Sequence, residues 1–294
     1  MRKVIAIGES VLDTLFVDNQ PAKSFVGGRI PCAAASLGAM GIPTRFVSEC
    51  TTDAVGDIVV DFLQRHGVDI TSVDRYPDGA TPLSAIFRQD DGSQKIINYG
   101  VYPKTRFDVV WPRIDENDVV LFGSLYAIDL PQRERLFELV KHAVERKAIL
   151  VYLPGFQHGI NFRLTKVMPN LLENLELSDI VIAHQHDVEE IFPNETRDEA
   201  FVNHFEFYCR NYLHINRDLS VTHCALKQTT TPCPADNLLG WQAGFVAGVI
   251  QELFRRDIDK DSLAQAGNDI WKPLIDNGLK NAALAAKSPE NCIS

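Results

Sequence analysis

Residues 231–248 contain the arrangement in this chain that is best suited to chemistry. Two prolines lead into Asp236 and Asn237, and a long apolar run with spaced Gly and Ala residues follows. Asp is a favoured N-cap, so the run predicts a buried helix that begins at Asp236. The free N–H groups of a first helical turn attract an anion, and a carboxylate there can take a proton from a hydroxyl. The simpler interpretation is an Asp that only caps the helix.

An early carboxylate and a pair of glycines form a second candidate group. The short β-branched run 3–8 predicts a buried strand, and Asp13 follows in the loop after it. Ligands of open α/β sheets bind at the carboxyl ends of strands, where Asp13 can accept hydrogen bonds from two sugar hydroxyls. Gly27 and Gly28 precede a predicted helix of small residues at 30–40 and let a ligand approach the backbone closely. Both features also fit purely structural turns, and the residues alone leave these alternatives open.

The spacing of cysteines and histidines predicts no metal site. The cysteines are scattered, without a Cys-x-x-Cys pair or a histidine at zinc-ligand spacing from two of them. His184, His186 and Asp187 have metal-binding side chains, but adjacent residues of an irregular segment are more often surface polar groups. The cysteines are Cys32, Cys50, Cys209, Cys224, Cys233 and Cys292.

Composition and charge exclude two classes of partner. The 294 residues carry a formal net charge of −10, and the isoelectric point is about 5.3 without any basic stripe. Nucleic acid and anionic membrane surfaces are therefore not expected as partners. The apolar run at the start of the chain is too short for a signal peptide or a membrane span. We expect a cytoplasmic protein.

Alternating strand and helix patterns organise the rest of the chain. Buried-strand runs at 118–122, 148–152 and 180–184 are separated by helical patterns such as 131–146. Repeated βα units favour a mainly parallel sheet with right-handed crossovers. Residues 81–100 differ, because two alternating segments flank an Asp-Gly turn and predict a β-hairpin. Such a hairpin can act as a lid that excludes water, so the pattern alone gives an α/β fold with a lid.

The order of these pieces resembles the ribokinase-like carbohydrate kinases of the PfkB family over nearly the whole chain. The most specific likeness lies in residues 27–41, which are similar to the Gly-Gly-x-x-x-Asn-x-Ala signature of that family, and bacterial fructokinase-type members are closest. The resemblance implies a three-layer α/β/α sandwich with a mainly parallel central sheet and a small β-hairpin lid. It implies one domain over 1–294 with lid segments around 14–26 and 81–105. An exposed lid edge also makes a homodimer through the lid an expectation.

The same resemblance implies ATP-dependent phosphorylation of a sugar hydroxyl, with ATP and Mg²⁺ as cofactors and a small-molecule sugar as partner. Asp236 then takes the position of the general base, and the three residues before it form the anion hole for the γ-phosphate. No side chain is expected to bind the metal directly. The implied site residues are Cys233, Pro234 and Ala235 in the anion hole, Asp13, Gly27, Gly28 and Cys32 at the sugar, and His184, Asp187 and Asp218 on the nucleotide and metal side.

Several positions depart from the family pattern, mainly on the phosphate side. The Gly-Ala-Gly-Asp motif of the family corresponds to residues 233–236 here, where Pro234 has no N–H to donate. The Asn-x-x-Glu motif corresponds to residues 184–187, where the Asn is lost and the acid is shortened to Asp. A different alignment of the first motif puts Leu239 at the base position and leaves no base.

Three hypotheses remain open from the sequence. The first is a working sugar kinase with an unusual site, and the second is a non-catalytic relative that binds a sugar or a partner protein. The third is a different enzyme that uses Cys32 as a nucleophile, because a helix start can lower the pKa of a thiol. No base beside Cys32 is identifiable from the sequence, which favours a structural role for this residue.

Overall fold

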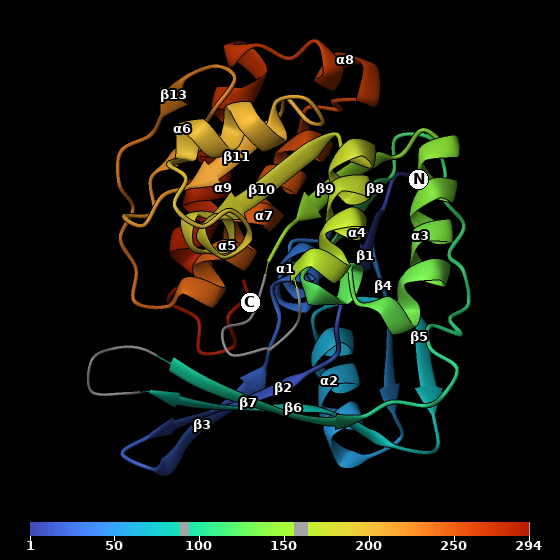
Figure 1. Cartoon of the computed structure of the whole chain (residues 1–294). Coiled ribbons are helices and arrows are strands. Elements are labelled where there is room, and N and C mark those ends of the chain that lie inside the picture. The colour runs from blue at the N-terminus through green and yellow to red at the C-terminus, as the bar shows by residue number, and fades with distance from the viewer. Residues whose placement is uncertain (89–93, 156–163, 294) are drawn as a thin grey trace.

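A large, mostly parallel sheet forms the centre of the molecule (Figure 1). The structure is a computed structural model that describes residues 1–88, 94–155 and 164–293. Within these residues the strand order is β13-β12-β11-β10-β9-β8-β1-β4-β5. All neighbours from β11 to β5 are parallel, and β12 and β13 add an antiparallel edge, so the predicted parallel sheet is confirmed. The strands are β1 (Val4–Ile7), β4 (Thr44–Thr51), β5 (Asp69–Tyr76), β8 (Val119–Gly123), β9 (Ile149–Leu153), β10 (Ile180–His184), β11 (Tyr212–Ile215), β12 (Val221–His223) and β13 (Gln228–Thr229).

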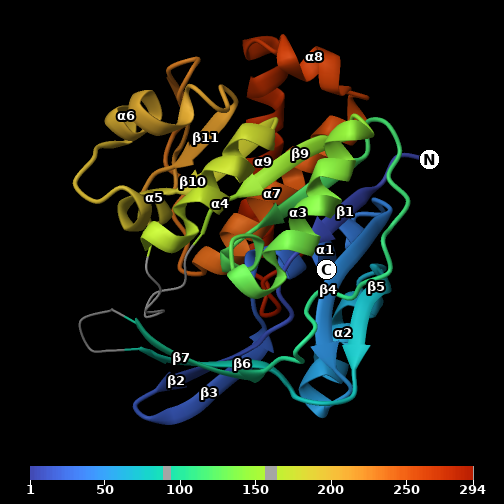
Figure 2. The ribbon, with the colours of Figure 1, turned by 45° about the vertical axis from the view of Figure 1, so that its right-hand side comes forward.

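Successive strand residues point into two different hydrophobic cores, one on each face of the large sheet. In β1, Val4 and Ala6 belong to one core, whereas Ile5 and Ile7 belong to the other. Helices α1, α2, α7 and α9 contribute to the first core and α3, α4 and α5 to the second, which gives the expected three layers (Figure 2). The helices are α1 (Arg29–Ala39), α2 (Ala54–Arg65), α3 (Leu130–Glu145), α4 (Leu164–Leu177), α5 (Gln185–Ile191), α6 (Arg197–Ala200), α7 (Leu238–Arg255), α8 (Lys260–Ala264) and α9 (Asn268–Ala285), with a 3₁₀ turn η1 (Leu125–Ala127) and a π-helical turn η2 (Phe201–Phe205).

A second, smaller sheet lies beside the main body, at the bottom of Figure 1. Its strand order is β3-β2-β6-β7. Strands β6 and β7 pair antiparallel and form the hairpin that the sequence predicts, although its Asp-Gly turn lies outside the described residues. The strands are β2 (Leu12–Val17), β3 (Gln20–Val26), β6 (Ala80–Arg88) and β7 (Gln94–Val101).

Helix α7 is buried along most of its length and touches α9 almost backbone to backbone. Three glycines spaced four residues apart make this approach possible, because a Cβ on each would lie 2.6 Å from a carbonyl oxygen of α9. The buried helix predicted after residue 236 is thereby confirmed. The glycines are Gly240, Gly244 and Gly248.

The predicted N-cap of α7 is wrong by one residue. Asn237 caps the helix, and its side-chain oxygen accepts a hydrogen bond from the N–H of Gly240 at 3.1 Å. Asp236 precedes this cap and is exposed. Asn and Asp are nearly equal as N-caps, so their order in the sequence does not decide which of them caps.

None of the described helices has both the length and the apolar character needed to cross a membrane.

Candidate functional site

Asp13 is a buried carboxylate with an unsatisfied oxygen. Its side chain lies on β2 of the small sheet, not in the loop after β1 where the sequence placed it, and the residue is 5% exposed. Burial raises the pKa of Asp13 to about 7, and the nearby Ser84 hydroxyl acts in the opposite direction. Among the described residues, Oδ1 of Asp13 has no hydrogen-bond partner. A ligand hydroxyl could supply the missing donor, since buried acceptors are costly when unpaired.

The glycine pair lies directly against two carboxylates. A Cβ on Gly27 would overlap the carboxylate of Asp13, so any larger residue would displace that group. Gly28 has a φ of 84° in the left-handed region and stands at the N-cap position of α1. A Cβ there would lie 2.6 Å from Oε1 of Glu9. The structure thus brings together Asp13, Gly27 and Gly28, and it gives a steric reason for both glycines.

Cys32 lies behind this group and is completely buried. Its thiol donates a hydrogen bond to the carbonyl oxygen of Val26, with 3.4 Å between the sulfur and oxygen atoms. Burial raises the pKa of Cys32 well above its ordinary value. Burial and the raised pKa therefore disfavour Cys32 as a nucleophile, because the reactive species would be the thiolate.

Glu9 and Ser124 complete this side of the site, and the sequence did not single them out. The Ser124 hydroxyl donates a hydrogen bond to the carboxylate of Glu9. Burial raises the pKa of Glu9, while the bond from Ser124 and the charge of Arg29 lower it. Ser124 follows β8 with a φ of 55°, an uncommon conformation for a residue other than glycine. The only advance signal for these residues was that both follow buried strands of a parallel sheet.

Arg29 links the glycine pair to the predicted nucleotide and metal side. Its Nη1 lies 2.7 Å from Oδ2 of Asp187, and its Nη2 lies 3.3 Å from Oδ1. Nη2 also donates to the carbonyl oxygen of Pro154 at 3.3 Å. A Cβ on Gly155 would overlap the guanidinium, which explains the glycine at that position. Asp187 in turn accepts a hydrogen bond from the N–H of His184 at 3.2 Å and closes the capping box of α5.

A pocket of about 270 Å³ lies beside the first turn of α5. Three segments that are far apart in the sequence meet there: the end of β10, the turn between β11 and β12, and the loop before α7. Asp218 belongs to that turn and is exposed, and the hydrogen bonds from Ser220 lower its pKa. Burial lowers the pKa of His184 to about 4, so its imidazole is neutral at pH 7. The lining residues are His184, His186, Arg217, Leu219, Ala235 and Leu238.

The loop before α7 holds the other residues that the sequence predicts on the phosphate side. The Cys233 carbonyl oxygen accepts a hydrogen bond from Nε1 of Trp241 at 3.1 Å, which anchors the loop on the helix. Pro234 and Asp236 are exposed. The first turn of α7 contains no acidic residue, and the alternative position Leu239 is partly buried against the core. Asp236 therefore lies outside the helix, one residue beyond Ala235 of the pocket lining.

Comparisons with known proteins agree with this fold. A family model described as pfkB family carbohydrate kinase matches residues 1–204. A curated protein of Pyrococcus horikoshii, described as a putative sugar kinase, is 22% identical over 202 residues. That match spans 63% of this chain and 62% of the curated protein, so it leaves more than a third of each outside.

Two solved structures are similar over almost their whole length. Aminoimidazole riboside kinase from Salmonella enterica, complexed with aminoimidazole riboside and an ATP analogue, has a TM-score of 0.80 and 15% identity, covering 98% of this chain and 94% of that one. Fructokinase from Vibrio cholerae, bound to fructose, ADP and a calcium ion, has a TM-score of 0.76 and 16% identity, covering 99% and 95%. At this identity the similarity shows a shared fold.

Proposed function

The chain belongs to the pfkB family of carbohydrate kinases, and we propose that it transfers the γ-phosphoryl group of ATP to a hydroxyl of a sugar. The observation that carries this proposal is the buried carboxylate of Asp13, whose Oδ1 has no partner among the described residues. Gly27 lies directly against it, and Gly27 and Gly28 leave no room for a side chain at either position. A buried carboxylate oxygen that lacks a donor suits a ligand that brings hydroxyl groups.

We take fructose as the first substrate to test. Two similar structures are those of a riboside kinase and of a fructokinase, and the latter holds fructose and ADP. The sequence likeness to fructokinase-type members points the same way. The proposed contacts with the sugar are hydrogen bonds to Asp13 and close packing on the glycine pair, with Cys32 as part of the wall behind them.

The pocket at His184 and Ala235 is the proposed nucleotide side. Arg217 on its rim carries the positive charge that phosphates require, although Glu189 pairs with it at 2.6 Å. Mg²⁺ would arrive with the phosphates of ATP, since Asp187, the predicted acid here, is already paired with Arg29. When bound, such an ion neutralises the charge that develops on the transferred group.

Asp236 is the proposed general base. It would accept the proton of the sugar hydroxyl while the hydroxyl oxygen bonds to the γ-phosphorus and the bond between the γ-phosphorus and the bridging oxygen of ADP breaks. The backbone of Cys233 and Ala235 would face the transferred group. Pro234 between them has no N–H, so this anion hole would offer fewer donors than an unbroken run of amides.

A second candidate function is sugar binding without phosphoryl transfer. Two observations favour it: the first turn of α7 has no acidic residue, and Arg29 already compensates the charge of Asp187. Both would reduce catalysis on the phosphate side and leave the group around Asp13 intact.

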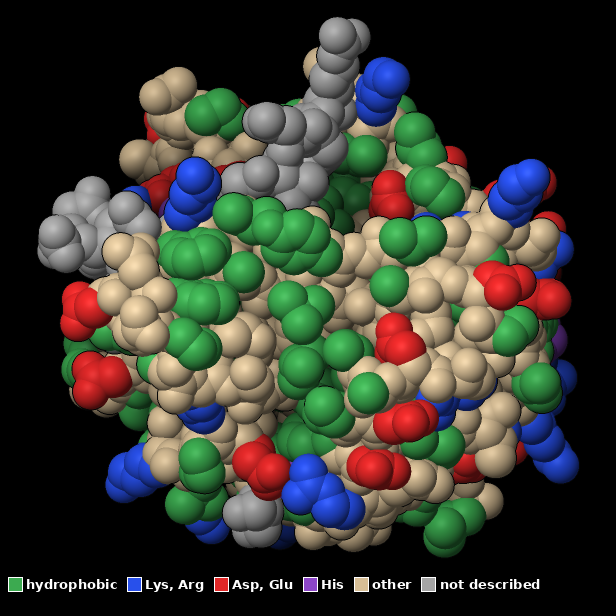
Figure 3. Space-filling view, turned by 90° about the horizontal axis from the view of Figure 1, so that it is seen from below, with side chains coloured by type: hydrophobic (Ala, Val, Ile, Leu, Met, Phe, Trp, Pro, Cys, Tyr) green, Lys and Arg blue, Asp and Glu red, His purple; other side chains and the backbone are tan. Residues whose placement is uncertain are grey.

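We further propose that the protein dimerises through the small sheet and acts in the cytoplasm. Hydrophobic side chains gather on the face seen from below (Figure 3). Phe16 and Phe87 stack in this sheet with 4.7 Å between their ring centroids, and Tyr99 and Val101 of β7 are each 59% exposed. Such a patch is typical of a contact surface. All the cysteines are free thiols, as expected in a reducing compartment.

Calorimetric titration separates the two candidate functions. The protein is titrated with Mg·ATP, with and without fructose, and separately with fructose alone. The kinase requires heat from nucleotide at micromolar to millimolar affinity. Binding of a sugar without any binding of nucleotide would overturn the kinase and support the binding protein.

A further inference from the structure

Three metal-binding side chains meet where α2 ends against the C-terminal segment. Nε2 of His66 lies 3.4 Å from Sγ of Cys292 and 3.6 Å from Oε2 of Glu290. The three ligand atoms all lie within 4.8 Å of one another. His66 and Cys292 are 226 residues apart in the chain, which is why sequence spacing predicted no such cluster.

The two separations that involve His66 match the edges of a tetrahedral metal site. Bonds of about 2.3 Å to sulfur and about 2.0–2.2 Å to nitrogen or oxygen give ligand-to-ligand edges of about 3.4–3.6 Å around Zn²⁺. The two edges that involve His66 are 3.4 and 3.6 Å. Nε2 of His66 is therefore already placed to share one ion with each of the other two ligands, and all three atoms lie within 4.8 Å.

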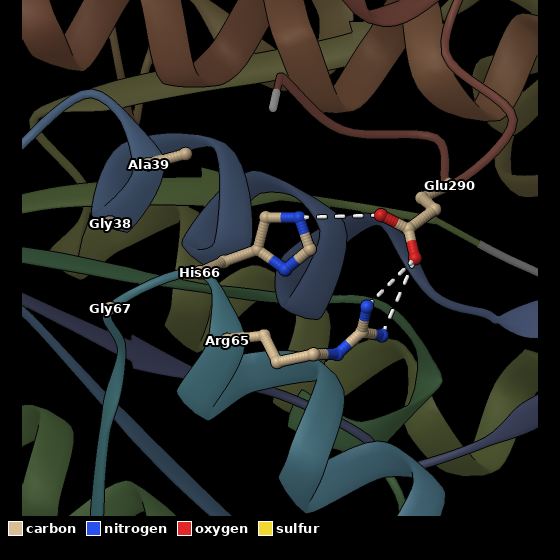
Figure 4. Close-up of a pocket in the computed structure, with 6 residues that line it drawn as sticks. All are labelled: Gly38, Ala39, Arg65, His66, Gly67 and Glu290. Carbon is tan, nitrogen blue, oxygen red and sulfur yellow. Dashed lines mark hydrogen bonds and ion pairs between the residues drawn. The ribbon is translucent and has the colours of Figure 1, made fainter.

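The surroundings orient two of the three ligands. Nδ1 of His66 lies 2.8 Å from the carbonyl oxygen of Phe62, which can only accept, so Nδ1 carries the proton and the lone pair of Nε2 faces the cluster. Oε1 of Glu290 pairs with Arg65 at 3.4 Å, so Oε2 is the oxygen turned toward His66 (Figure 4). A histidine held by a carbonyl is the usual arrangement behind a zinc ligand.

The cluster is shielded from solvent on the side of Cys292 and His66 and faces a pocket on the side of Glu290. Cys292 is completely buried and His66 is 8% exposed, whereas Glu290 lies on the wall of a pocket of about 390 Å³. The N–H of Ile293 donates to Oγ of Ser36 at 3.1 Å, which fixes the segment that carries the sulfur. An ion would thus have protein ligands on one side and room for a water molecule on the pocket side. The pocket is lined by Gly38, Ala39, Arg65, His66, Gly67 and Glu290.

We propose that His66, Glu290 and Cys292 form a zinc site that ties the C-terminal segment to the end of α2. The mixed nitrogen, sulfur and oxygen donors suit Zn²⁺ better than Mg²⁺, which prefers oxygen ligands alone. On binding, the thiol proton of Cys292 passes to solvent and the thiolate bonds to the ion, with water in the fourth position. None of the three ligands lines the pocket proposed for the nucleotide.

The test uses the full chain, stripped with a chelator and titrated with Co²⁺, whose bond to a thiolate gives a charge-transfer absorption. The expected result is one equivalent of Co²⁺ with that band and with the visible bands of a tetrahedral ion, displaced by Zn²⁺. Zn²⁺ should also raise the melting temperature of the wild type. Cys292→Ser should lose the band, and Glu290→Gln should weaken binding about tenfold or more.

Cys209→Ser is the matched control, since Cys209 is a buried cysteine outside the cluster. It should bind Co²⁺ as the wild type does. Circular dichroism establishes that each variant is folded, and Glu290→Gln provides the test at the pocket wall should Cys292→Ser fail to fold. The proposal is overturned if the wild type gives no thiolate band, if a folded Cys292→Ser keeps that band, or if Glu290→Gln binds Co²⁺ like the wild type.

Discussion

Arg29 and Asp187 form a bidentate ion pair, with Nη1 at 2.7 Å from Oδ2 and Nη2 at 3.3 Å from Oδ1. The pair joins the first residue of α1, directly after the glycine pair, to the first turn of α5 at the predicted nucleotide side. The side chains are 15% and 9% exposed, so the pair is largely shielded from water. The guanidinium of Arg29 also fills the space that a side chain at position 155 would need. One arginine that the sequence reading did not single out thus connects the two halves of the candidate site.

Arg29→Ala should destabilise the protein by about 3 kcal/mol, because Asp187 would keep a poorly solvated charge without its guanidinium. Arg29→Lys should lose less stability, since lysine keeps the positive charge but cannot make the bidentate contact of the guanidinium. Urea unfolding of the variants measures both. Arg113→Ala is the control, as Arg113 pairs with Asp115 at 2.8 Å but is 85% exposed, and it should change stability by less than about 1 kcal/mol. Equal effects of Arg29→Ala and Arg113→Ala would show that the Arg29 pair contributes little.

Asp13→Asn should stabilise the protein at neutral pH and abolish sugar binding. The pKa of Asp13 is raised from 3.8 to about 7 by burial, so between these values the folded state holds a proton that the unfolded state releases. Stability from this group is therefore highest below the lower value and falls as pH rises toward 7. Thermal melts of wild type and Asp13→Asn, measured near pH 5 and at about pH 8, should show the larger gain for Asn at the higher pH.

Sugar affinity should also depend on the ionisation of Asp13, but it should increase with pH where stability decreases. Ligand hydroxyls donate best to the ionised form, so wild-type affinity should increase as pH rises through about 7. A flat affinity profile in calorimetric titrations, together with an unchanged affinity in Asp13→Asn, would contradict the placement of the sugar on Asp13.

The general plan of this fold could be predicted because strong patterns carry it. The helix of small residues predicted at 30–40 is α1, which ends at Ala39, and Gly41 follows with a φ of 78°, a conformation that favours glycine after a helix. Asp53 caps α2 through the N–H of Gly56 at 2.7 Å, and Asp is a favoured N-cap residue. Both features are local, so neighbouring residues suffice to specify them.

Elements that depend on distant contacts were missed. Residues 213–226 lack a clear pattern, yet they contain most of β11 and all of β12, and β11 is held by pairing with β10. Residues 196–212 carry aromatic and apolar side chains at helical spacing, yet they form only α6 and a π-helical turn before β11 starts. The aromatic spacing there reflects packing instead, since Phe205 stacks on Tyr212 with 4.2 Å between ring centroids. Short strands and short helices are the elements that tertiary contacts most easily override.

The sequence indicated which residues to consider for the candidate site, but not which of their side chains contact one another. Asp13, Gly27 and Gly28 do lie together, but the cause is the antiparallel pairing of β2 with β3, which brings the end of β3 against Asp13. Glu9, Arg29 and the cluster around His66 depend on which side chains meet across the fold. The spacing of residues along the chain does not predict such contacts.

Tyr99→Glu should convert the proposed dimer into a monomer. A carboxylate at this 59% exposed position of β7 would be buried against a second copy at a high desolvation cost. Light scattering after size exclusion measures the mass. Phe207→Glu, at an 87% exposed aromatic residue outside the small sheet, should leave the mass unchanged. A wild-type monomer, or a dimer that survives Tyr99→Glu, would argue against this surface.

Sugar-dependent formation of ADP from Mg·ATP tests the central claim most directly. The wild type should release ADP when fructose or another sugar of a panel is present and not in its absence. Asp236→Ala should lower that rate by about 100-fold or more, as expected for a general base, while still binding the sugar. No sugar-dependent ADP from the wild type, with sugar binding intact, would contradict the kinase and leave a sugar-binding protein built on a kinase fold.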